Sequence, residues 1–162
     1  MIAPNVDPDT FFMREAVKEA LQARHDGEVP IGAVAVKGGE IIARGHNERR
    51  RLHDLTAHAE MMALRDFSTR ARTFDLSGIT IYSTLEPCAM CAGAMLHYGI
   101  HRVVWGAKDL KLGAVESKFH VLDGTDLKSR GGVLVDECRN LLLEFFQQEL
   151  GHPSNTWEDI AV

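Results

Sequence analysis

Two cysteines at C-x-x-C spacing are the first feature of this sequence that could carry chemistry. Cys88 directly follows Pro87, and Cys91 lies three residues after Cys88. Residues three apart on a helix lie about 60° apart around its axis, so both thiols can face one metal ion from the first helical turn. The positive end of the helix dipole favours their thiolate forms. With Cys138 as the only other cysteine, the set indicates metal or redox chemistry and not structural disulfides.

A histidine and a glutamate lie near the start of another predicted helix. His58 and Glu60 are two residues apart, or about 200° around a helix, so they cannot both face a metal on its flank. The metal must lie beyond the helix N-terminus, where first-turn side chains converge. One imidazole and two thiolates give zinc three ligands and leave one position for water. A carboxylate beside that water can accept its proton and return it to a leaving amine, and Glu60 has that role available.

Zinc nucleobase deaminases carry H-x-E followed by P-C-x-x-C, with the glutamate not a ligand. The chain has both segments, His58–Glu60 and Pro87–Cys91, which predicts a zinc-dependent hydrolytic deaminase. One alternative is a closed structural site with Cys138 as fourth ligand. Cys138, however, falls on the apolar stripe of the last predicted helix and is expected in the core. A second alternative is a zinc-folded partner subunit without activity, which the intact Glu60 argues against.

The elements that must position these residues follow from hydrophobic spacing and turn signals. Asp7 followed by proline predicts a helix over 8–25. Strands are expected at 31–37, 40–45, 79–83, 102–105 and 133–135, the first two joined by a Gly-Gly turn and an arginine-rich loop after the second. Further helices are expected at 56–67, at 88–98, around 115–122, and after a cap at Asp136. This order predicts an α/β fold, a three-layer α/β/α sandwich around a mixed five-stranded sheet.

Length and composition fit one domain over 1–162, with 151–162 a tail that is a candidate lid. The 162 residues are 45% hydrophobic and 25% charged, with a mean hydropathy of -0.12, which excludes a disordered or fibrous chain. No window holds eighteen uncharged apolar residues, and the first residues do not have the pattern of a secretory signal. No membrane contact and a cytoplasmic location are therefore expected.

The formal net charge of -5 comes from the C-terminal end of the chain. Residues 136–162 hold six acidic residues and one basic residue, whereas 1–135 balance at 17 against 17. Within the balanced part, Arg44 and the run 49–51 form a local basic cluster. This cluster is either a solvated loop or a surface that faces phosphate.

Five segments between about residues 9 and 115 resemble one enzyme family. They are VPIGAVAV at 29–36, GHN at 45–47, HDLTAHAEMMAL at 53–64, TLEPCAMCAGAM at 84–95 and GAKDLKLGA at 106–114. They resemble the cytidine and deoxycytidylate deaminase superfamily, most closely its tRNA adenosine deaminase branch. The resemblance implies a cytidine deaminase-like fold and a homodimer. It also implies roles for six residues: zinc binding by His58, Cys88 and Cys91, proton transfer by Glu60, substrate binding by Asn47, and a place at the pocket mouth for Asp109.

The last third of the chain instead resembles free-base cytosine deaminases. YGIHRVV at 98–104, LKSRGG at 127–132 and the terminal 157–160 carry this likeness, which implies that Trp157 stacks on the base and Asp159 accepts a hydrogen bond from its amino group. The HAE and LEPC motifs differ from the HGE and LSPC usual in that group. Because an acidic tail opposes phosphate binding and a closing tail suits a small base, a free base or nucleoside is expected first, cytosine type before others. The alternatives are the anticodon loop of tRNA, with wobble adenosine converted to inosine, and guanine.

Overall fold

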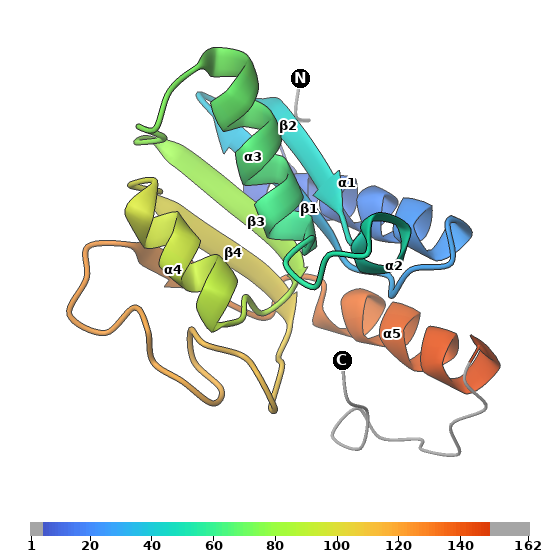
Figure 1. The fold of residues 1–162 in the computed structure, drawn as a ribbon. Helices are drawn as coiled ribbons and strands as arrows, with labels where there is room; N and C mark the ends of the chain where they lie inside the picture. Colours follow the sequence, from blue (N-terminus) through green and yellow to red (C-terminus); the bar gives the residue numbers. More distant parts are fainter. Residues whose placement is uncertain (1–4, 150–162) are drawn as a thin grey trace.

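The computed structural model of the chain describes residues 5–149. The predicted lid over 151–162, with Trp157 and Asp159, lies outside them. The described helices and strands follow in chain order: α1 (Pro8–His25), β1 (Gly32–Lys37), β2 (Glu40–His46), α2 (Arg49–Leu52), α3 (Ala59–Ala71), β3 (Ile79–Leu85), α4 (Ala89–His97), β4 (Arg102–Ala107), β5 (Lys128–Arg130) and α5 (Val135–Glu149) (Figure 1). None of the described helices is long and apolar enough to cross a membrane.

The five strands form one mixed sheet in the order β2-β1-β3-β4-β5. β1 pairs antiparallel with β2 and with β3, whereas β3–β4 and β4–β5 are parallel. Helices α1 and α5 pack on one face of the sheet, and α3 and α4 on the other (Figure 1). The predicted three-layer sandwich is confirmed.

Alternation along the strands builds a core on each face of the sheet. In β1, Val34 and Val36 pack toward α1 and α5, whereas Ala35 packs toward α3 and α4, as the two-residue period of a strand requires. Two glycines let the helices approach the sheet backbone. A Cβ at Gly32 would lie 2.1 Å from the carbonyl oxygen of a residue in α1, and one at Gly45 would lie 2.3 Å from the carbonyl oxygen of Ala59. The second contact fixes the beginning of α3 against β2.

The expected strand at 133–135 is wrong, because the fifth strand is Lys128–Arg130. Its three residues are all exposed, so no alternation of apolar and polar residues predicts this strand. Its backbone pairs with the edge of β4. Val133 is buried but lies in a turn between Gly132, with φ 81°, and Leu134, with φ 53°. Helix α5 then begins at Val135, so Asp136 is its second residue and not its cap.

The expected helix around 115–122 is also absent from the described structure, which has turns there. The N–H groups of Val115, Glu116 and Ser117 donate to the buried carboxylate of Glu86. Phe119 donates to the carbonyl of Gly113 in a further turn. Hydrogen bonds to a side chain from another part of the fold thus replace the repeating pattern of a helix.

Smaller differences concern the arginine-rich segment and the helix starts. Residues 49–52 form the short helix α2, where a loop was expected. Helix α3 begins at Ala59 and α4 at Ala89. His58 and Cys88 are therefore the N-cap residues of the two helices, one position before the first turn.

Candidate active site

The beginnings of α3 and α4 meet at one edge of the sheet and bring together three side chains that could hold a metal ion. His58 caps α3, Cys88 caps α4, and Cys91 lies in the first turn of α4. Both thiol sulfurs lie 3.6 Å from Nδ1 of His58. The three ligand atoms all lie within 4.8 Å of one another. No side chain caps either helix by a hydrogen bond, which leaves these atoms free to bind a cation.

The protonation states of these three groups are coupled. Hydrogen bonding from Cys91, opposed by burial and helped by His58, lowers the pKa of Cys88 to about 4. The hydrogen bond with Cys88 raises the pKa of His58 despite burial, and the hydrogen bond to Cys88 together with burial raises the pKa of Cys91 well above its usual value. One imidazole and two sulfurs form the donor set of a zinc site with three protein ligands, so the residues present fit zinc.

Cys138 lies on the opposite side of the sheet from this group. It is 1% exposed and packs in the core between the sheet and α1 and α5, whereas Cys91 belongs to the core under α3 and α4. Burial raises the pKa of Cys138 to about 12. The closed site with Cys138 as fourth ligand is therefore excluded, and the expected core position of this cysteine is confirmed.

Glu60 lies beside the three side chains, in the first turn of α3, and is 3% exposed. Ser83 of β3 donates a hydrogen bond of 3.1 Å to one carboxylate oxygen. The thiol of Cys91 donates to the other over 3.6 Å. Burial, the largest effect, raises the pKa of Glu60. A carboxyl group with a raised pKa can gain and lose a proton nearer neutral pH than an exposed glutamate.

A cavity of about 130 Å³ opens at this edge of the sheet. This is well below the ~300 to 1,000 Å³ typical of drug-sized ligand pockets, so the cavity suits a ligand group about as small as a single base. Its lining brings together six residues that the sequence singled out and five others: Ile31, Asn47, Arg49, His58, Ala59, Glu60, Leu85, Glu86, Cys88, Asp109 and Leu112.

Asn47 and Asp109, the two described residues expected to contact substrate, both line the cavity and are buried. The amide of Asn47 donates to the carbonyl of Val29 over 3.4 Å and accepts from the N–H of Arg49 over 3.3 Å. One oxygen of Asp109 accepts the N–H groups of Lys111 and Leu112. Both side chains are thus held in fixed orientations at the cavity.

Glu86 is the main residue of the cavity that sequence reasoning missed. It is 2% exposed, and its carboxylate accepts five hydrogen bonds from the loop after β4: four backbone N–H groups and the Ser117 hydroxyl. Burial opposes its ionisation, but these bonds outweigh it and lower the pKa of Glu86. Its place directly before Pro87 and Cys88 was the available signal. Glu86 therefore fixes the loop that carries Asp109 and Leu112.

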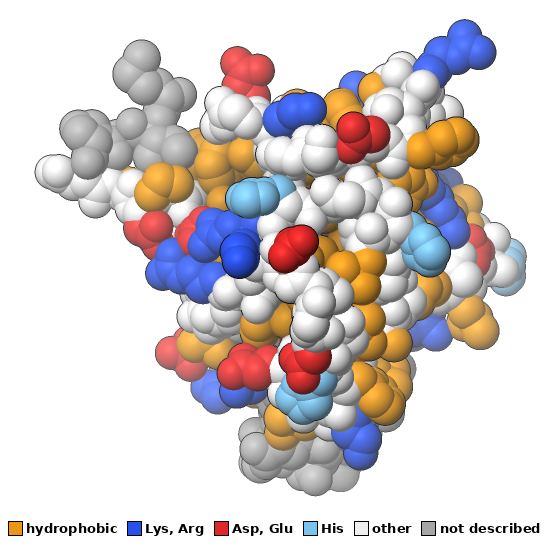
Figure 2. Space-filling model, turned by 90° about the vertical axis from the view of Figure 1, so that its left-hand side faces the viewer, with side chains coloured by type: hydrophobic (Ala, Val, Ile, Leu, Met, Phe, Trp, Pro, Cys, Tyr) orange, Lys and Arg blue, Asp and Glu red, His pale blue; other side chains and the backbone are white. Residues whose placement is uncertain are grey.

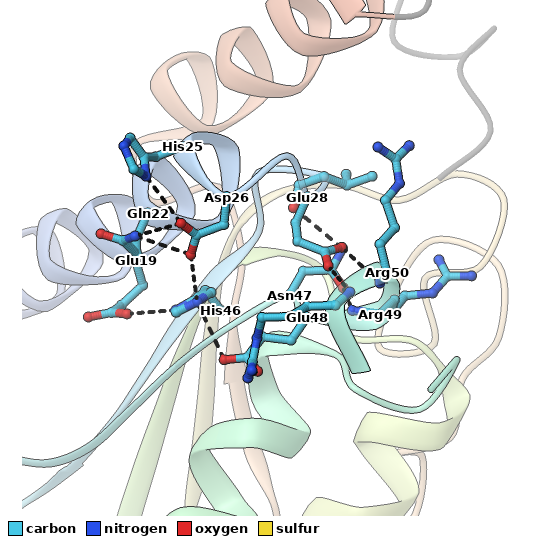
Figure 3. A network of polar contacts seen from close by, with 12 residues as sticks. Glu19, Gln22, His25, Asp26, Glu28, His46, Asn47, Glu48, Arg49 and Arg50 are labelled. Carbon is cyan, nitrogen blue, oxygen red and sulfur yellow. Dashed lines mark hydrogen bonds and ion pairs between the residues drawn. The ribbon is translucent and has the colours of Figure 1, made fainter. Parts of the chain in front are cut away.

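A second buried carboxylate, Glu28, fixes the other side of the cavity (Figure 3). It is 2% exposed and accepts the N–H groups of Arg50, over 3.2 Å, and Arg51, over 2.8 Å. Together with the bond from Arg49 to Asn47, these contacts satisfy the first N–H groups of α2, which have no partner inside a helix. Helix α2 is thus tied to the segment between α1 and β1.

His46, the last residue of β2, joins this region to α1 (Figure 3). Its Nδ1 lies 3.2 Å from Glu19, and its Nε2 lies 3.4 Å from Glu48 and 3.6 Å from Asp26. Because His46 directly precedes Asn47, these contacts hold the end of the strand from which the Asn47 side chain reaches the cavity.

Sequence and structure comparisons identify the class to which this arrangement belongs. The model of the cytidine and deoxycytidylate deaminase zinc-binding region matches residues 6–107, and the chain belongs to that family. It is a zinc-dependent deaminase, a hydrolytic enzyme.

Three individual proteins of this family show which deaminases the chain is similar to. The tRNA-specific adenosine deaminase of Bacillus subtilis (strain 168) is 43% identical over 86% of this chain and 89% of that protein. A solved structure from studies of A-to-I editing by tRNA:A34 deaminases at the wobble position of transfer RNA has 40% identity and a TM-score of 0.79, over 82% of this chain and 99% of that one. Guanine deaminase from Bacillus subtilis has 35% identity and a TM-score of 0.59, over 67% and 69%.

These likenesses favour the tRNA alternative over the cytosine-type substrate that the sequence placed first. The two tRNA deaminases have greater identity to this chain than the guanine deaminase and cover more of it. Both matches extend past the central motifs. The expectation of a cytosine-type enzyme depended on short segments in the last third and on the tail.

Proposed function

We propose that this protein is a tRNA adenosine deaminase that converts the wobble adenosine of an anticodon loop to inosine. The observation that carries the proposal is the 43% identity to a tRNA-specific adenosine deaminase over 86% of the chain. The cavity is consistent with it, because deaminases of nucleic acids take the target base out of the stack into a small pocket. A cavity of about 130 Å³ would take the base and leave the sugar and phosphates outside.

In this proposal, His58, Cys88 and Cys91 hold the zinc ion. When bound there, zinc activates water as a nucleophile near neutral pH. Asn47 and Asp109 orient the base and its flanking atoms, because both lie at the cavity with side chains fixed by backbone groups. Leu85 and Leu112 provide apolar walls, which exclude bulk water from the ring.

Glu60 moves the protons of the reaction. Its carboxylate accepts a proton from water as the C–O bond forms at C6 of adenine. It then donates that proton to the exocyclic amino group, the C6–N bond breaks, and ammonia leaves. Water and adenosine thus give inosine and ammonia. The hydrogen bond from Ser83 holds one oxygen of Glu60 in place while the other faces Cys91 and the metal-binding group.

A second candidate is deamination of a free base, guanine or cytosine. The 35% identity to a guanine deaminase and the acidic segment 136–162 favour it. Ammonia release from an anticodon stem-loop, guanine, cytosine, cytidine and adenosine, measured side by side with zinc-loaded protein, separates the two. The proposal expects release from the stem-loop at a kcat/KM at least a hundredfold above that for any small substrate. Release from guanine or cytosine alone would contradict it.

The homodimer implied by the family resemblance stays a prediction. Light scattering coupled to gel filtration should give twice the 18.0 kDa of one chain. A mass of 18 kDa at micromolar concentration would contradict it.

A further inference from the structure

Three consecutive arginines begin helix α2, beside the cavity, and their side chains have different surroundings. Arg50 donates 2.9 Å to the carbonyl of Gly27, and its guanidinium lies 6.0 Å from the ring centre of Phe145. Arg51 forms an ion pair with Glu48. The Arg49 and Arg50 side chains point in different directions (Figure 3), and only Arg49 of the three lines the cavity. The run is therefore not a uniform solvated loop.

Among the side chains described, those of residues 5–148, the guanidinium of Arg49 has no hydrogen-bond or ion-pair partner. Its Nε is shielded from solvent and makes no hydrogen bond. A buried donor without a partner costs ~1 to 3 kcal/mol, so such a group points to a ligand. The carboxylates that line the cavity have other partners: Glu86 and Asp109 accept backbone N–H groups of the loop after β4, and Glu60 accepts from Ser83 and Cys91.

The backbone of Arg49 is held in place, although its guanidinium has no partner among the described side chains. Its N–H donates to Asn47, and the next two N–H groups of α2 donate to the buried carboxylate of Glu28. The contact to Asn47 links Arg49 directly to another residue of the cavity lining. This arrangement presents one cation at a fixed place beside the catalytic pocket.

The chemistry of the missing partner follows from the guanidinium and from the size of the cavity. A guanidinium offers forked donors that match the oxygens of a phosphate, and a charge-assisted pair of this kind is strong. Since the cavity takes the base alone, a phosphate next to that nucleotide must lie near the cavity mouth. On the face shown in Figure 2, several Lys and Arg side chains gather at one place, bordered by Asp, Glu and hydrophobic side chains. On this face, phosphate contact therefore depends on a small number of cations.

We propose that Arg49 binds a backbone phosphate directly flanking the nucleotide whose base enters the cavity, and thereby favours RNA over free bases and nucleosides. The inference rests on the proposed function, since it requires a polynucleotide substrate. Arg49 in this role is a specificity residue that contacts substrate, distinct from the groups that transfer protons.

The test compares single arginine variants of the full, zinc-loaded chain on an anticodon stem-loop. Arg49→Ala should weaken stem-loop binding about tenfold or more. Arg51→Ala is the control, because the Arg51 side chain already pairs with Glu48, and it should change binding less than threefold. The slope of log Kd against log salt should fall by about 0.7 for Arg49→Ala, the value for one phosphate contact on a single strand. Arg49→Lys keeps the charge and should recover part of the affinity. Zinc content and the circular dichroism spectrum verify that each variant is folded.

A chemical counterpart locates the phosphate. Two further stem-loops carry a neutral methylphosphonate, one on the 5′ side and one on the 3′ side of the target adenosine. On one of them the wild-type protein should lose the same tenfold, and Arg49→Ala should lose nothing more. If Arg49→Ala still loses about tenfold in affinity on both modified stem-loops, Arg49 does not bind either flanking phosphate. Equal losses of affinity in Arg49→Ala and Arg51→Ala would also overturn the proposed role of Arg49. Lack of wild-type binding to any stem-loop would overturn the proposed function and this inference with it.

Discussion

Glu86 binds Ser117 twice, through the backbone N–H at 2.9 Å and through the hydroxyl group. The two residues are 31 positions apart in the sequence. Glu86 directly follows β3 and precedes Pro87 and Cys88, and Ser117 belongs to the loop after β4. This relationship couples the position of the cavity wall to that of Pro87 and Cys88, so one buried carboxylate organises two sides of the site.

Glu86→Gln should therefore destabilise the protein and impair the site. An amide places an N–H₂ group opposite backbone donors, so at least one buried N–H loses its acceptor, at a cost of about 1 to 3 kcal/mol. Urea denaturation should show this loss in the free energy of unfolding, together with a raised KM for the stem-loop. Glu116→Gln is the matched control, because that side chain is in the same loop and 56% exposed. Equal stability of the two variants would contradict the role given to Glu86.

Metal content tests the three proposed zinc ligands. His58→Ala, Cys88→Ser and Cys91→Ser should each lose zinc, because two remaining protein ligands hold the ion poorly. Cys138→Ser should keep about one zinc per chain, as wild type, since Cys138 lies in the other core. Elemental analysis of dialysed protein measures this. Zinc retained by Cys88→Ser at wild-type affinity would exclude the three-ligand site.

Glu60→Ala separates proton transfer from metal binding. The variant should keep zinc and fold, because Glu60 is proposed to face the water and not to bind the ion. Its kcat on the stem-loop should fall by at least the ~10² to 10⁴ that general acid–base catalysis contributes. Near-normal turnover in single-turnover experiments would remove Glu60 from the mechanism. Ser83→Ala, which removes only the hydrogen bond to Glu60, should lower kcat less.

The carboxylate of Asp9 should make stability depend on pH in the acid range. It is 5% exposed and accepts bonds from Arg102, Tyr82 and Arg130, which tie the start of α1 to three strands. Burial opposes ionisation, but these bonds outweigh it and lower the pKa of Asp9 from 3.8 to about 2. A lowered pKa in the folded state adds stability that is present above pH 3.8 and is lost as pH falls toward 2.

The lowering of the Asp9 pKa from 3.8 to about 2 corresponds to about 2 kcal/mol of stability. Urea denaturation between pH 6 and pH 2 should show wild type losing about that much more than Asp9→Asn, which has no carboxylate to protonate. Asp136→Asn, at a side chain 79% exposed, is the control and should follow wild type. A gap between wild type and Asp9→Asn that stays constant with pH would contradict this account.

The sequence predicts the elements that have an apolar period of their own. It does not predict those that depend on hydrogen bonds to distant parts of the chain. The buried strands and the long helices carry apolar periods, and the chemistry of His58 and Cys88 follows from residue types at helix starts. The strand Lys128–Arg130 has no apolar period, because its pairing with β4 involves backbone groups only. The turns around Ser117 depend on Glu86, far away in the sequence. The sequence also does not show that, among the described side chains, Arg50 and Arg51 have partners and the Arg49 guanidinium has none.

Deleting residues 153–162 tests the substrate hypotheses against each other. The deletion removes Trp157, Asp159 and the acidic Glu158. If RNA is the substrate, removing negative charge should leave stem-loop deamination intact or raise it, because phosphate binding depends on electrostatic attraction. If a small base is the substrate and Trp157 stacks on it, the deletion should reduce free-base deamination about tenfold or more, since stacking contributes ~1 to 3 kcal/mol per base. Both activities are measured on the same preparation, with zinc content unchanged as the control. If truncation instead lowers stem-loop deamination, and by the same factor at low and high salt, the tail does not act on RNA through its negative charge alone.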